Sequence, residues 1–331
     1  MSAADTLPVV FLALMGAAML AYVVLDGYDL GVGMLLPAVE RPDKDTMIAS
    51  IGPFWDANET WLVLGVGILL IAFPAAHGLI LGALYLPVAL MLVGLVLRGV
   101  AFDFRVKAQD RWKPAWDRAF FAGSLLASSS QGWMLGRYVT GLSEGVPQTL
   151  FAAAIAALLP AAYLLLGACW LVMKTEGALQ ARAIGWARRA WPAVVLGMGA
   201  ISLATPWVSE TVRGRWFAMP QLAWLLPIPL VTAAALLAAR ARLTPEVAAS
   251  SRCWQPFALV VGVFVLGAVG LAYSLFPFVV MDRLTIWEAA SAPEALAVIA
   301  IGCAITVPAI VGYTILSYRI FRGKARPLDY A

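Results

Sequence analysis

The sequence predicts an all-α integral membrane protein of about nine transmembrane helices, and three observations support this fold class. Of its 331 residues, 62% are hydrophobic and only 13% are charged, whereas soluble domains are about 25% charged. Apolar stretches recur at about the 20 residues that one bilayer crossing needs. Basic residues cluster between these stretches, which is typical of membrane topology rather than of nucleic-acid binding. We therefore expect residues 1–331 to form a single polytopic domain in a lipid bilayer.

Nine apolar stretches are long enough to be spans. The sixth and seventh are the hardest to delimit because they are short and contain several prolines. The first eight are enough for two four-helix bundles, although composition alone does not show that arrangement. The predicted spans are 8–36, 53–73, 77–102, 116–139, 148–173, 190–208, 220–239, 254–278 and 293–321.

The basic clusters predict the orientation of the chain. No basic residue precedes the first span, and the first one, Arg41, follows it. Further clusters follow the third, fifth, seventh and ninth spans, so we expect the N-terminus outside and the C-terminus in the cytoplasm. Arg213 and Arg215 depart from this rule, because they fall on the predicted outer side.

The start of the last predicted span has a helix-capping pattern. Ser291-Ala292-Pro293-Glu294 combines a serine, a proline in the first turn and a glutamate three residues after the serine. We expect Ser291 to cap the helix and Glu294 to reach back to it.

Ionisable residues occur within or beside the first three spans. Asp26 and Asp29 are three residues apart and share one helix face, as do Asp56 and Glu59 at the start of the second span. Arg98 lies near the end of the third span. At 1.5 Å per residue, Asp26 and Arg98 both lie roughly 30 Å from the outer starts of their spans. Three helices thus bring charged groups to the same cytoplasmic level.

Placing charged side chains in a membrane costs free energy, and this cost indicates that these residues have a function. An aspartate or arginine at mid-membrane costs about 2.5–3.5 kcal/mol, and less near the edge. A helix-end or snorkelling interpretation fits single residues, but aspartate side chains are too short to snorkel. Arg98 can lower the cost by pairing with carboxylates, and a carboxylate left unpaired could bind and release protons. We predict a proton-uptake route from the cytoplasm whose members are Asp26, Asp29, Asp56, Asn58, Glu59 and Arg98.

The sequence lacks the residues that metal and haem enzymes need. It has one histidine, His77, which cannot supply a bis-histidine haem or a binuclear centre. The cysteines Cys169, Cys253 and Cys303 lie in or beside apolar runs and form no CxxC pair, so we expect them to be small core residues. We therefore predict no metal site and no catalytic residue in this chain. Most tryptophans fall near span ends, where aromatic belts form, although a quinone could also bind against such side chains.

Five motifs resemble subunit II of the cytochrome bd quinol oxidases. DGYDLGVG from Asp26, GPFWDANETWL from Gly52 and RGVAFDFR from Arg98 resemble its first half. YSLFPFVV from Tyr273 and LTIWEAAS from Leu284 resemble its second half. The motifs occur in the same order along essentially the whole chain, and WDANETW is most similar to the cyanide-insensitive branch. Met281-Asp282 departs from the pattern, since a proline is expected nearby.

The resemblance implies a function and a division of labour. The complex would oxidise ubiquinol and reduce oxygen to water, taking protons from the cytoplasm across a bacterial inner membrane. Two b-type haems and one d-type haem would be held by subunit I, the heterodimer partner. This chain would fold as two four-helix bundles over about 8–139 and 148–278 with a peripheral helix over 293–321, and its proton path would include Asp26, Asp29 and Asp56. It would be catalytic only within the complex. Bound ubiquinone and small accessory subunits remain open questions.

Two alternatives belong to other functional classes. A proton-coupled secondary transporter could use Asp26, Asp56 and Arg98 to bind a substrate. Such transporters place their site near the midplane on corresponding helices of two halves, whereas these charges lie near one face and only in the first half. The third alternative is a membrane scaffold whose polar cluster only packs against a partner.

Overall fold

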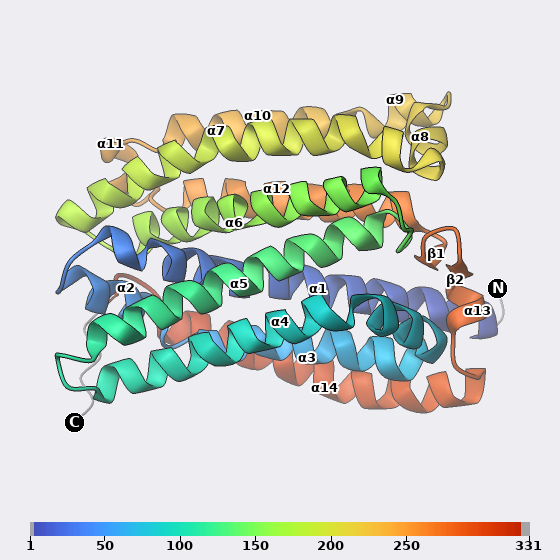
Figure 1. Cartoon of the computed structure of the whole chain (residues 1–331), viewed down its shortest axis with the longest axis horizontal. Coiled ribbons are helices and arrows are strands. Elements are labelled where there is room, and N and C mark those ends of the chain that lie inside the picture. The colour runs from blue at the N-terminus through green and yellow to red at the C-terminus, as the bar shows by residue number, and fades with distance from the viewer. Residues whose placement is uncertain (1–2, 326–331) are drawn as a thin grey trace.

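The chain is described by a computed structural model that covers residues 3–325 and consists almost entirely of roughly parallel and antiparallel helices (Figure 1). The first half contains α1 (Ala3–Leu35), η1 (Leu36–Ala38), α2 (Asp43–Ile51), α3 (Trp55–Ala72), α4 (Pro74–Lys107), α5 (Lys113–Val139) and α6 (Val146–Lys174). The second half contains α7 (Gly177–Val208), α8 (Glu210–Phe217), α9 (Gln221–Leu225), α10 (Pro227–Arg242), α11 (Pro245–Ala248), α12 (Gln255–Leu275), β1 (Phe278–Val280), β2 (Leu284–Thr285), α13 (Ile286–Ala289) and α14 (Pro293–Ile320).

The long helices confirm the all-α membrane fold. Within residues 3–325, eight helical segments are long and apolar enough to cross a membrane. The predicted span 116–139 corresponds to α5, which is 27 residues long but more polar than the others. Its polar side chains, among them Ser124, Ser128 and Gln131, are buried against neighbouring helices. Because α5 packs between α4 and α6, these groups are shielded from lipid, which explains why α5 has the length of a span without its hydropathy.

Three boundaries differ from the sequence-based expectations. The sixth predicted span begins at Gly177 rather than at residue 190, so α7 contains three arginines in its first turns. The seventh is divided at Leu226, where α9 ends and α10 begins with a proline. The predicted cap of the last span is wrong: the N-cap position is Ala292, which makes no side-chain cap bond. Ser291 instead donates to the backbone oxygen of Ile71 at 2.7 Å, and so ties this turn to the end of α3.

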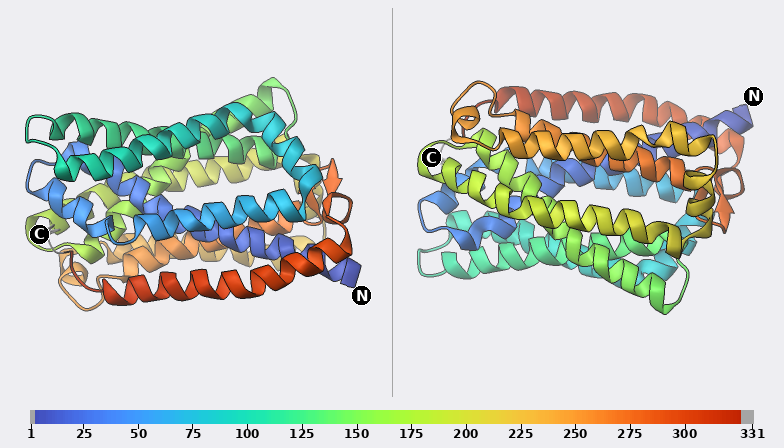
Figure 2. Two further views of the ribbon diagram at one scale, coloured as in Figure 1. Left: turned by 90° about the horizontal axis from the view of Figure 1, so that it is seen from below. Right: turned by 90° about the horizontal axis from the view of Figure 1, so that it is seen from above.

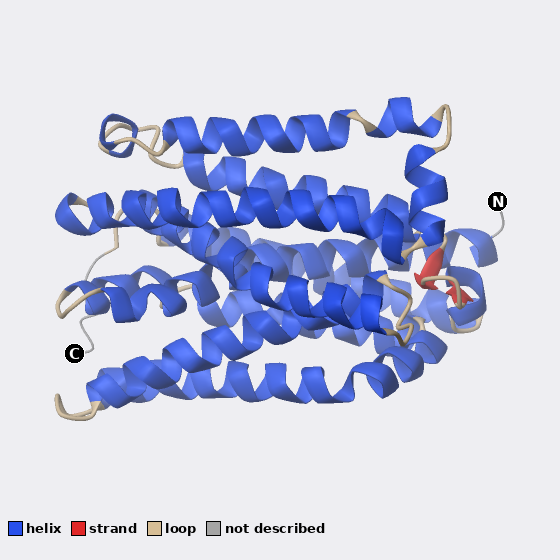
Figure 3. Ribbon diagram, turned by 45° about the horizontal axis from the view of Figure 1, so that its top comes forward, coloured by secondary structure: helices blue, strands red, loops and turns tan. Residues whose placement is uncertain are grey.

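The two ends of the bundle differ in structure. At one end, here the β end, β1 and β2 form a short antiparallel pair beside α13 (Figure 3). Thr285 and Glu288 form the capping box that begins α13. At the opposite end, here the α2 end, lie α2, α11, the ends of α1, α4, α6, α10 and α14 and the starts of α3, α5, α7 and α12 (Figure 1). The orientation predicted from the basic residues places the α2 end in the cytoplasm.

α1 lies in the middle of the bundle and contacts α3, α5, α6, α12 and α14. Glycines allow its close approach to α6. A Cβ atom on Gly31 would lie 1.9 Å from the backbone oxygen of Tyr163, and one on Gly167 would lie 2.6 Å from the carbonyl carbon of Gly31. A Cβ on Gly27 would lie 2.7 Å from the ring of Tyr163. The small residues Gly27 and Gly31 thus let α1 and α6 pack closely.

α14 runs along the edge of the bundle in both views of Figure 2. Only Leu296 and Ser317 of this helix are fully buried, which agrees with a peripheral helix. Its C-terminal end is anchored at the α2 end, where Lys174 donates to the backbone oxygen of Phe321 at 2.8 Å and Lys324 donates to that of Thr175 at 2.8 Å. The last helix is thereby fixed against the turn between α6 and α7.

Candidate functional site

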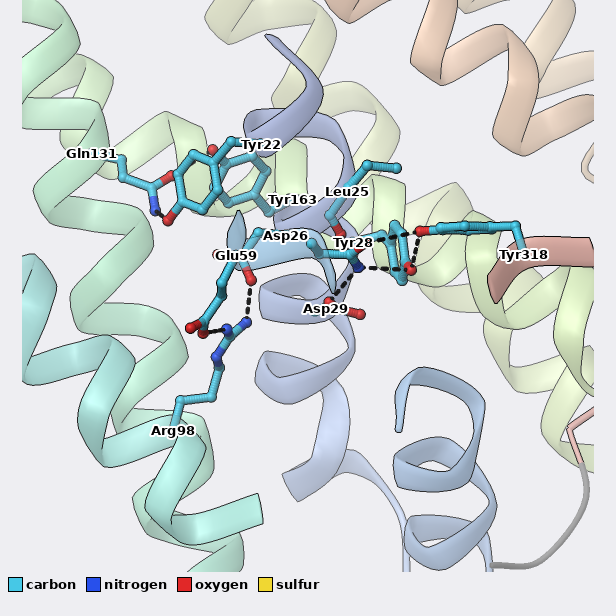
Figure 4. A network of polar contacts seen from close by, with 11 residues as sticks. Tyr22, Leu25, Asp26, Tyr28, Asp29, Glu59, Arg98, Gln131, Tyr163 and Tyr318 are labelled. Carbon is cyan, nitrogen blue, oxygen red and sulfur yellow. Dashed lines mark hydrogen bonds and ion pairs between the residues drawn. The ribbon is translucent and has the colours of Figure 1, made fainter. Parts of the chain in front are cut away.

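The predicted charged residues of three helices meet around one guanidinium group (Figure 4). Arg98 of α4 approaches Asp26 of α1, with Nη1 lying 2.5 Å from Oδ1. Its other terminal nitrogen, Nη2, contacts the carboxylate of Glu59 on α3. The side chains of Arg98 and Asp26 are almost completely buried, whereas that of Glu59 is 30% exposed. The structure therefore brings these three residues together, as the sequence predicts.

Asp29 lies next to this group but has a different kind of partner. It is completely buried, and its Oδ2 accepts a hydrogen bond of 2.8 Å from Nδ2 of Asn58. The same amide nitrogen donates to the hydroxyl of Tyr28 at 2.9 Å, and Tyr318 of α14 donates to the amide oxygen at 3.1 Å. The two tyrosine hydroxyls lie 2.6 Å apart. Asn58 is thus the predicted neutral member, and two tyrosines that the sequence reasoning missed hold it in place.

A second polar branch extends from α1 toward α5 and α6, and the sequence analysis missed it as well. Gln131 donates to the hydroxyl of Tyr22 at 2.8 Å and accepts a hydrogen bond of 2.6 Å from Tyr163. Tyr22 is one helical turn before Asp26 on the same face of α1. A polar residue one helical turn before Asp26, within an apolar run, was the sequence signal that could have revealed this branch.

Asp26 and Arg98 lie at one level along the bundle. Asp26 and Arg98 each lie about nine residues from the α2 end of their helices, which is roughly 14 Å at 1.5 Å per residue. Their position at the cytoplasmic boundary of the hydrocarbon stays a prediction, because α1 and α4, at 33 and 34 residues, are longer than one bilayer crossing needs. The charges thus share one level, but within the helices rather than at their ends.

Asp56 is the predicted residue that the structure does not bring into this cluster. It lies one turn before Glu59 on α3, and its side chain is exposed. Within residues 3–325, its carboxylate makes no hydrogen bond or ion pair. Asp56 and the exposed part of Glu59 therefore mark the side on which the buried cluster approaches the surface of this chain.

Toward the α2 end, an apolar layer closes off the cluster. Asp29 and Arg98 border a tightly packed region with no room for a water molecule. The rest of its lining consists of Ile51, Trp55, Gly99, Phe102 and Phe120. Phe102 and Phe120 are almost fully buried, and the Trp55 ring packs 5.3 Å from that of Phe102. Apart from Asp29 and Arg98, this lining contains no ionisable side chain.

A second ion cluster lies beyond the apolar layer. Arg105 of α4, two helical turns after Arg98, contacts Asp117 of α5 and approaches Asp45 of α2 at 2.6 Å. Lys44 pairs with the other oxygen of Asp117 at 3.0 Å. The four residues join α2, α4 and α5 at the α2 end, and their charges balance. This arrangement fits a structural clamp.

The potential metal-ligand side chains of residues 3–325 are not clustered. Within residues 3–325, no group of three or more His, Cys, Asp or Glu side chains is placed to hold a metal ion. His77 lies in the first turn of α4, at the opposite end of that helix from Arg98. Cys169 is buried, and Cys253 and Cys303 are partly buried and free, so none of them pairs with another described cysteine.

Comparison with known protein families matches residues 7–321 to the family described as cytochrome bd terminal oxidase subunit II. The chain belongs to this family. The match includes the three helices that carry the Arg98 cluster and the last helix that supplies Tyr318. Subunit II membership decides against the transporter alternative.

Individual relatives agree with this assignment. The chain is 28% identical to cytochrome bd ubiquinol oxidase subunit 2 of Bacillus subtilis, over 92% of this chain and 94% of that protein. It is 27% identical to cytochrome bd-I ubiquinol oxidase subunit 2 of Escherichia coli K12, over 98% and 97%. Its fold resembles the structure of bd oxidase from Geobacillus thermodenitrificans, with a TM-score of 0.77, 17% identity and coverage of 96% of this chain and 99% of that chain.

Proposed function

We propose that this chain supports the haem-bearing subunit I of a ubiquinol-oxidising cytochrome bd complex and supplies part of its proton-uptake route. The proposed substrate, ubiquinol, is the one in the names of the relatives at 27–28% identity. The single histidine supports placing the haems in the partner, because a bis-histidine haem or a binuclear centre needs more histidines than this chain has. When bound there, the haems carry electrons from quinol to oxygen, and the chemistry of this chain is limited to binding and moving protons.

One observation carries the proton proposal. Asp26 and Arg98 are buried, and Glu59 connects them to the surface because it contacts Arg98 while its side chain is 30% exposed. Buried ionisable groups inside a membrane are costly and mark ion or proton pathways. We propose that protons reach the cluster along the exposed side of α3, first at Asp56 and then at Glu59.

The apolar layer supports this lateral route over a direct one. The second ion cluster, around Arg105, is separated from Asp29 by Ile51, Trp55, Phe102 and Phe120. Protons move along hydrogen-bonded groups or water, and apolar side chains provide neither. We therefore propose that the Arg105 cluster clamps helices and takes no part in proton uptake.

The orientation follows the basic residues. Lys and Arg are enriched in the connections at the α2 end, which is expected of the cytoplasmic side of a bacterial inner membrane. Proton uptake at Asp56 would then take place from the cytoplasm, with the N-terminus in the periplasm. Reaction of a single introduced cysteine at position 109 with an impermeant reagent tests this, since it should label only from the cytoplasmic side.

The motif around Asp56 also supports placement in the cyanide-insensitive branch. GPFWDANETWL is the form that most resembles that branch. Oxygen consumption by the purified complex at increasing cyanide concentrations tests this placement. Inhibition at the low concentrations that stop haem-copper oxidases would contradict it.

The experiment for the proton route is Asp56→Asn in the assembled complex. Quinol-driven oxygen consumption should fall several-fold, because the route loses its outermost proton-binding group while the partly exposed Glu59 stays in place. Haem content should stay unchanged, because the Asp56 side chain is exposed and its carboxylate makes no hydrogen bond or ion pair within residues 3–325. Asp103→Asn is the matched control, since Asp103 is also exposed and lies near the α2 end. Unchanged turnover in Asp56→Asn would remove Asp56 from the route and favour the scaffold alternative.

A further inference from the structure

The carboxylates of the Arg98 cluster are unequally compensated. Asp26 and Glu59 each contact one terminal nitrogen of Arg98. Asp29 forms no ion pair in the described part of the chain, and its Oδ1, like Oδ2 of Asp26, is buried with no hydrogen-bond partner there. The three acids are therefore not equivalent, although the sequence places them in one group.

The charge count shows which state of Asp29 this site favours. The guanidinium of Arg98 supplies one positive charge, which two carboxylates already share. An ionised Asp29 would add a further negative charge within one helical turn of Asp26, at a position with no exposure to solvent. Burial and a neighbouring like charge both favour the neutral form of a carboxyl group. A bound proton removes this excess charge without any other change in the site.

The hydrogen bonds around Asn58 indicate which oxygen of Asp29 is free to carry that proton. The amide oxygen of Asn58 accepts from Tyr318, so the amide nitrogen faces Asp29 and donates to its Oδ2. A carboxyl oxygen that accepts the hydrogen of an amide cannot carry its own proton in the same direction. The remaining atom, Oδ1, has no partner among the described residues.

We propose that Asp29 is the member of the cluster that holds a proton at rest, on Oδ1, while Asp26 and Glu59 remain ionised against Arg98. The role of this proton in turnover rests on the route proposed above, whereas its presence does not. Tyr318 is a positioning residue, since it acts on Asp29 through the orientation of Asn58 and through its contact with Tyr28 (Figure 4). Through these contacts, α14 influences the protonation state of Asp29 on α1.

Infrared spectroscopy of the intact oxidase complex tests this proposal. Protonated carboxylic acids absorb in a carbonyl region separate from that of carboxylates, and ¹³C labelling of aspartate identifies the aspartate bands. We expect wild type to show one labelled band that shifts in D2O and is absent from Asp29→Asn. Asp29→Glu, which keeps an acid at this position, should also lose the labelled-aspartate band. Asp103→Asn should keep it. Identical spectra of wild type and both Asp29 variants would overturn the proposal.

The positioning role has its own measurement. Tyr318→Phe removes the hydroxyl that holds Asn58 and should shift the frequency of the Asp29 band without removing it. Tyr313→Phe is the matched control, because Tyr313 lies on the same helix and is 55% exposed. An unchanged band in Tyr318→Phe would contradict the positioning role. The visible haem spectrum of each preparation shows whether the complex has assembled.

Turnover separates this inference from the proposed function. If Asp29→Asn loses the band but consumes oxygen at the wild-type rate, the proton on Asp29 is supported and the route through Asp29 is wrong. If Asp29→Asn slows turnover while the band persists, the proton assignment is overturned and the route stands.

Discussion

Nη1 of Arg98 lies 2.5 Å from Oδ1 of Asp26, and this buried contact joins α4 to α1 in the interior of the helix bundle. The same guanidinium contacts Glu59, so three helices depend on one cation. Removing one partner of a buried ion pair leaves an uncompensated charge, which is more costly than replacing the whole pair by apolar groups. The first prediction follows from this asymmetry.

Arg98→Leu should destabilise the complex by about 3–5 kcal/mol, because Asp26 and Glu59 would lose their counter-charge. Thermal unfolding followed through the haem absorbance measures this effect. The triple variant with Asp26→Asn and Glu59→Gln should recover part of the loss. Arg118→Leu is the control, since Arg118 is exposed. A single Arg98→Leu variant that unfolds at the wild-type temperature would show that the contact does not stabilise the bundle.

The crossing of α1 and α6 should be intolerant of side chains. A Cβ on Gly31 would lie 1.9 Å from a backbone oxygen of α6, so Gly31→Ala must separate the two helices. We expect reduced assembly, measured as haem bound per milligram of purified membrane protein. Gly16→Ala, on the same helix, meets no atom within 4 Å and should assemble normally. Equal haem content in the two variants would argue against the close approach.

Asp110 should contribute a small, pH-dependent stabilisation at the α2 end. It lies in the connection between α4 and α5, where its hydrogen bond to Lys113 and the charges of Lys113 and Arg41 lower its pKa. A lowered pKa in the folded state means that the contribution is present above the ordinary value, about 3.9, and is lost as the pH falls through the lowered value.

Asp110→Asn should therefore lower the unfolding temperature slightly at neutral pH, and its difference from wild type should shrink as the pH falls below about 4. The effect stays small because Asp110 is exposed and water screens its ion pairs. Asp103→Asn serves as the control at each pH. A difference in unfolding temperature that grows as the pH falls would contradict a stabilising ion pair at Asp110.

The fold and the site were not equally predictable from the sequence. Apolar runs of span length locate the long helices, because the bilayer imposes their length and composition. α5 is correctly predicted as a helix of span length although its Ser124 and Gln131 lower its hydropathy. The boundary of α7 is wrong, because helix continues through basic residues once they lie beyond the lipid.

Within the site, spacing predicted the convergence of Asp26, Glu59 and Arg98, because it fixes the helix face and the depth. It could not predict that Asp56 faces outward while Asn58, two residues later, faces Asp29. It also could not show that Tyr318 reaches Asn58, since that contact joins residues 260 positions apart and depends on how α14 packs. Contacts of this kind arise from tertiary packing, for which no local pattern exists.

The central claim is that protons enter the buried cluster through Glu59. The most direct test is proton uptake by the assembled oxidase, measured with a pH indicator in weakly buffered solution while the fully reduced enzyme reacts with oxygen. Glu59→Gln keeps the size of the side chain and should slow uptake about 10-fold or more. Glu144→Gln, at an exposed position at the β end, should match wild type. Wild-type uptake kinetics in Glu59→Gln, with full haem content, would contradict the account.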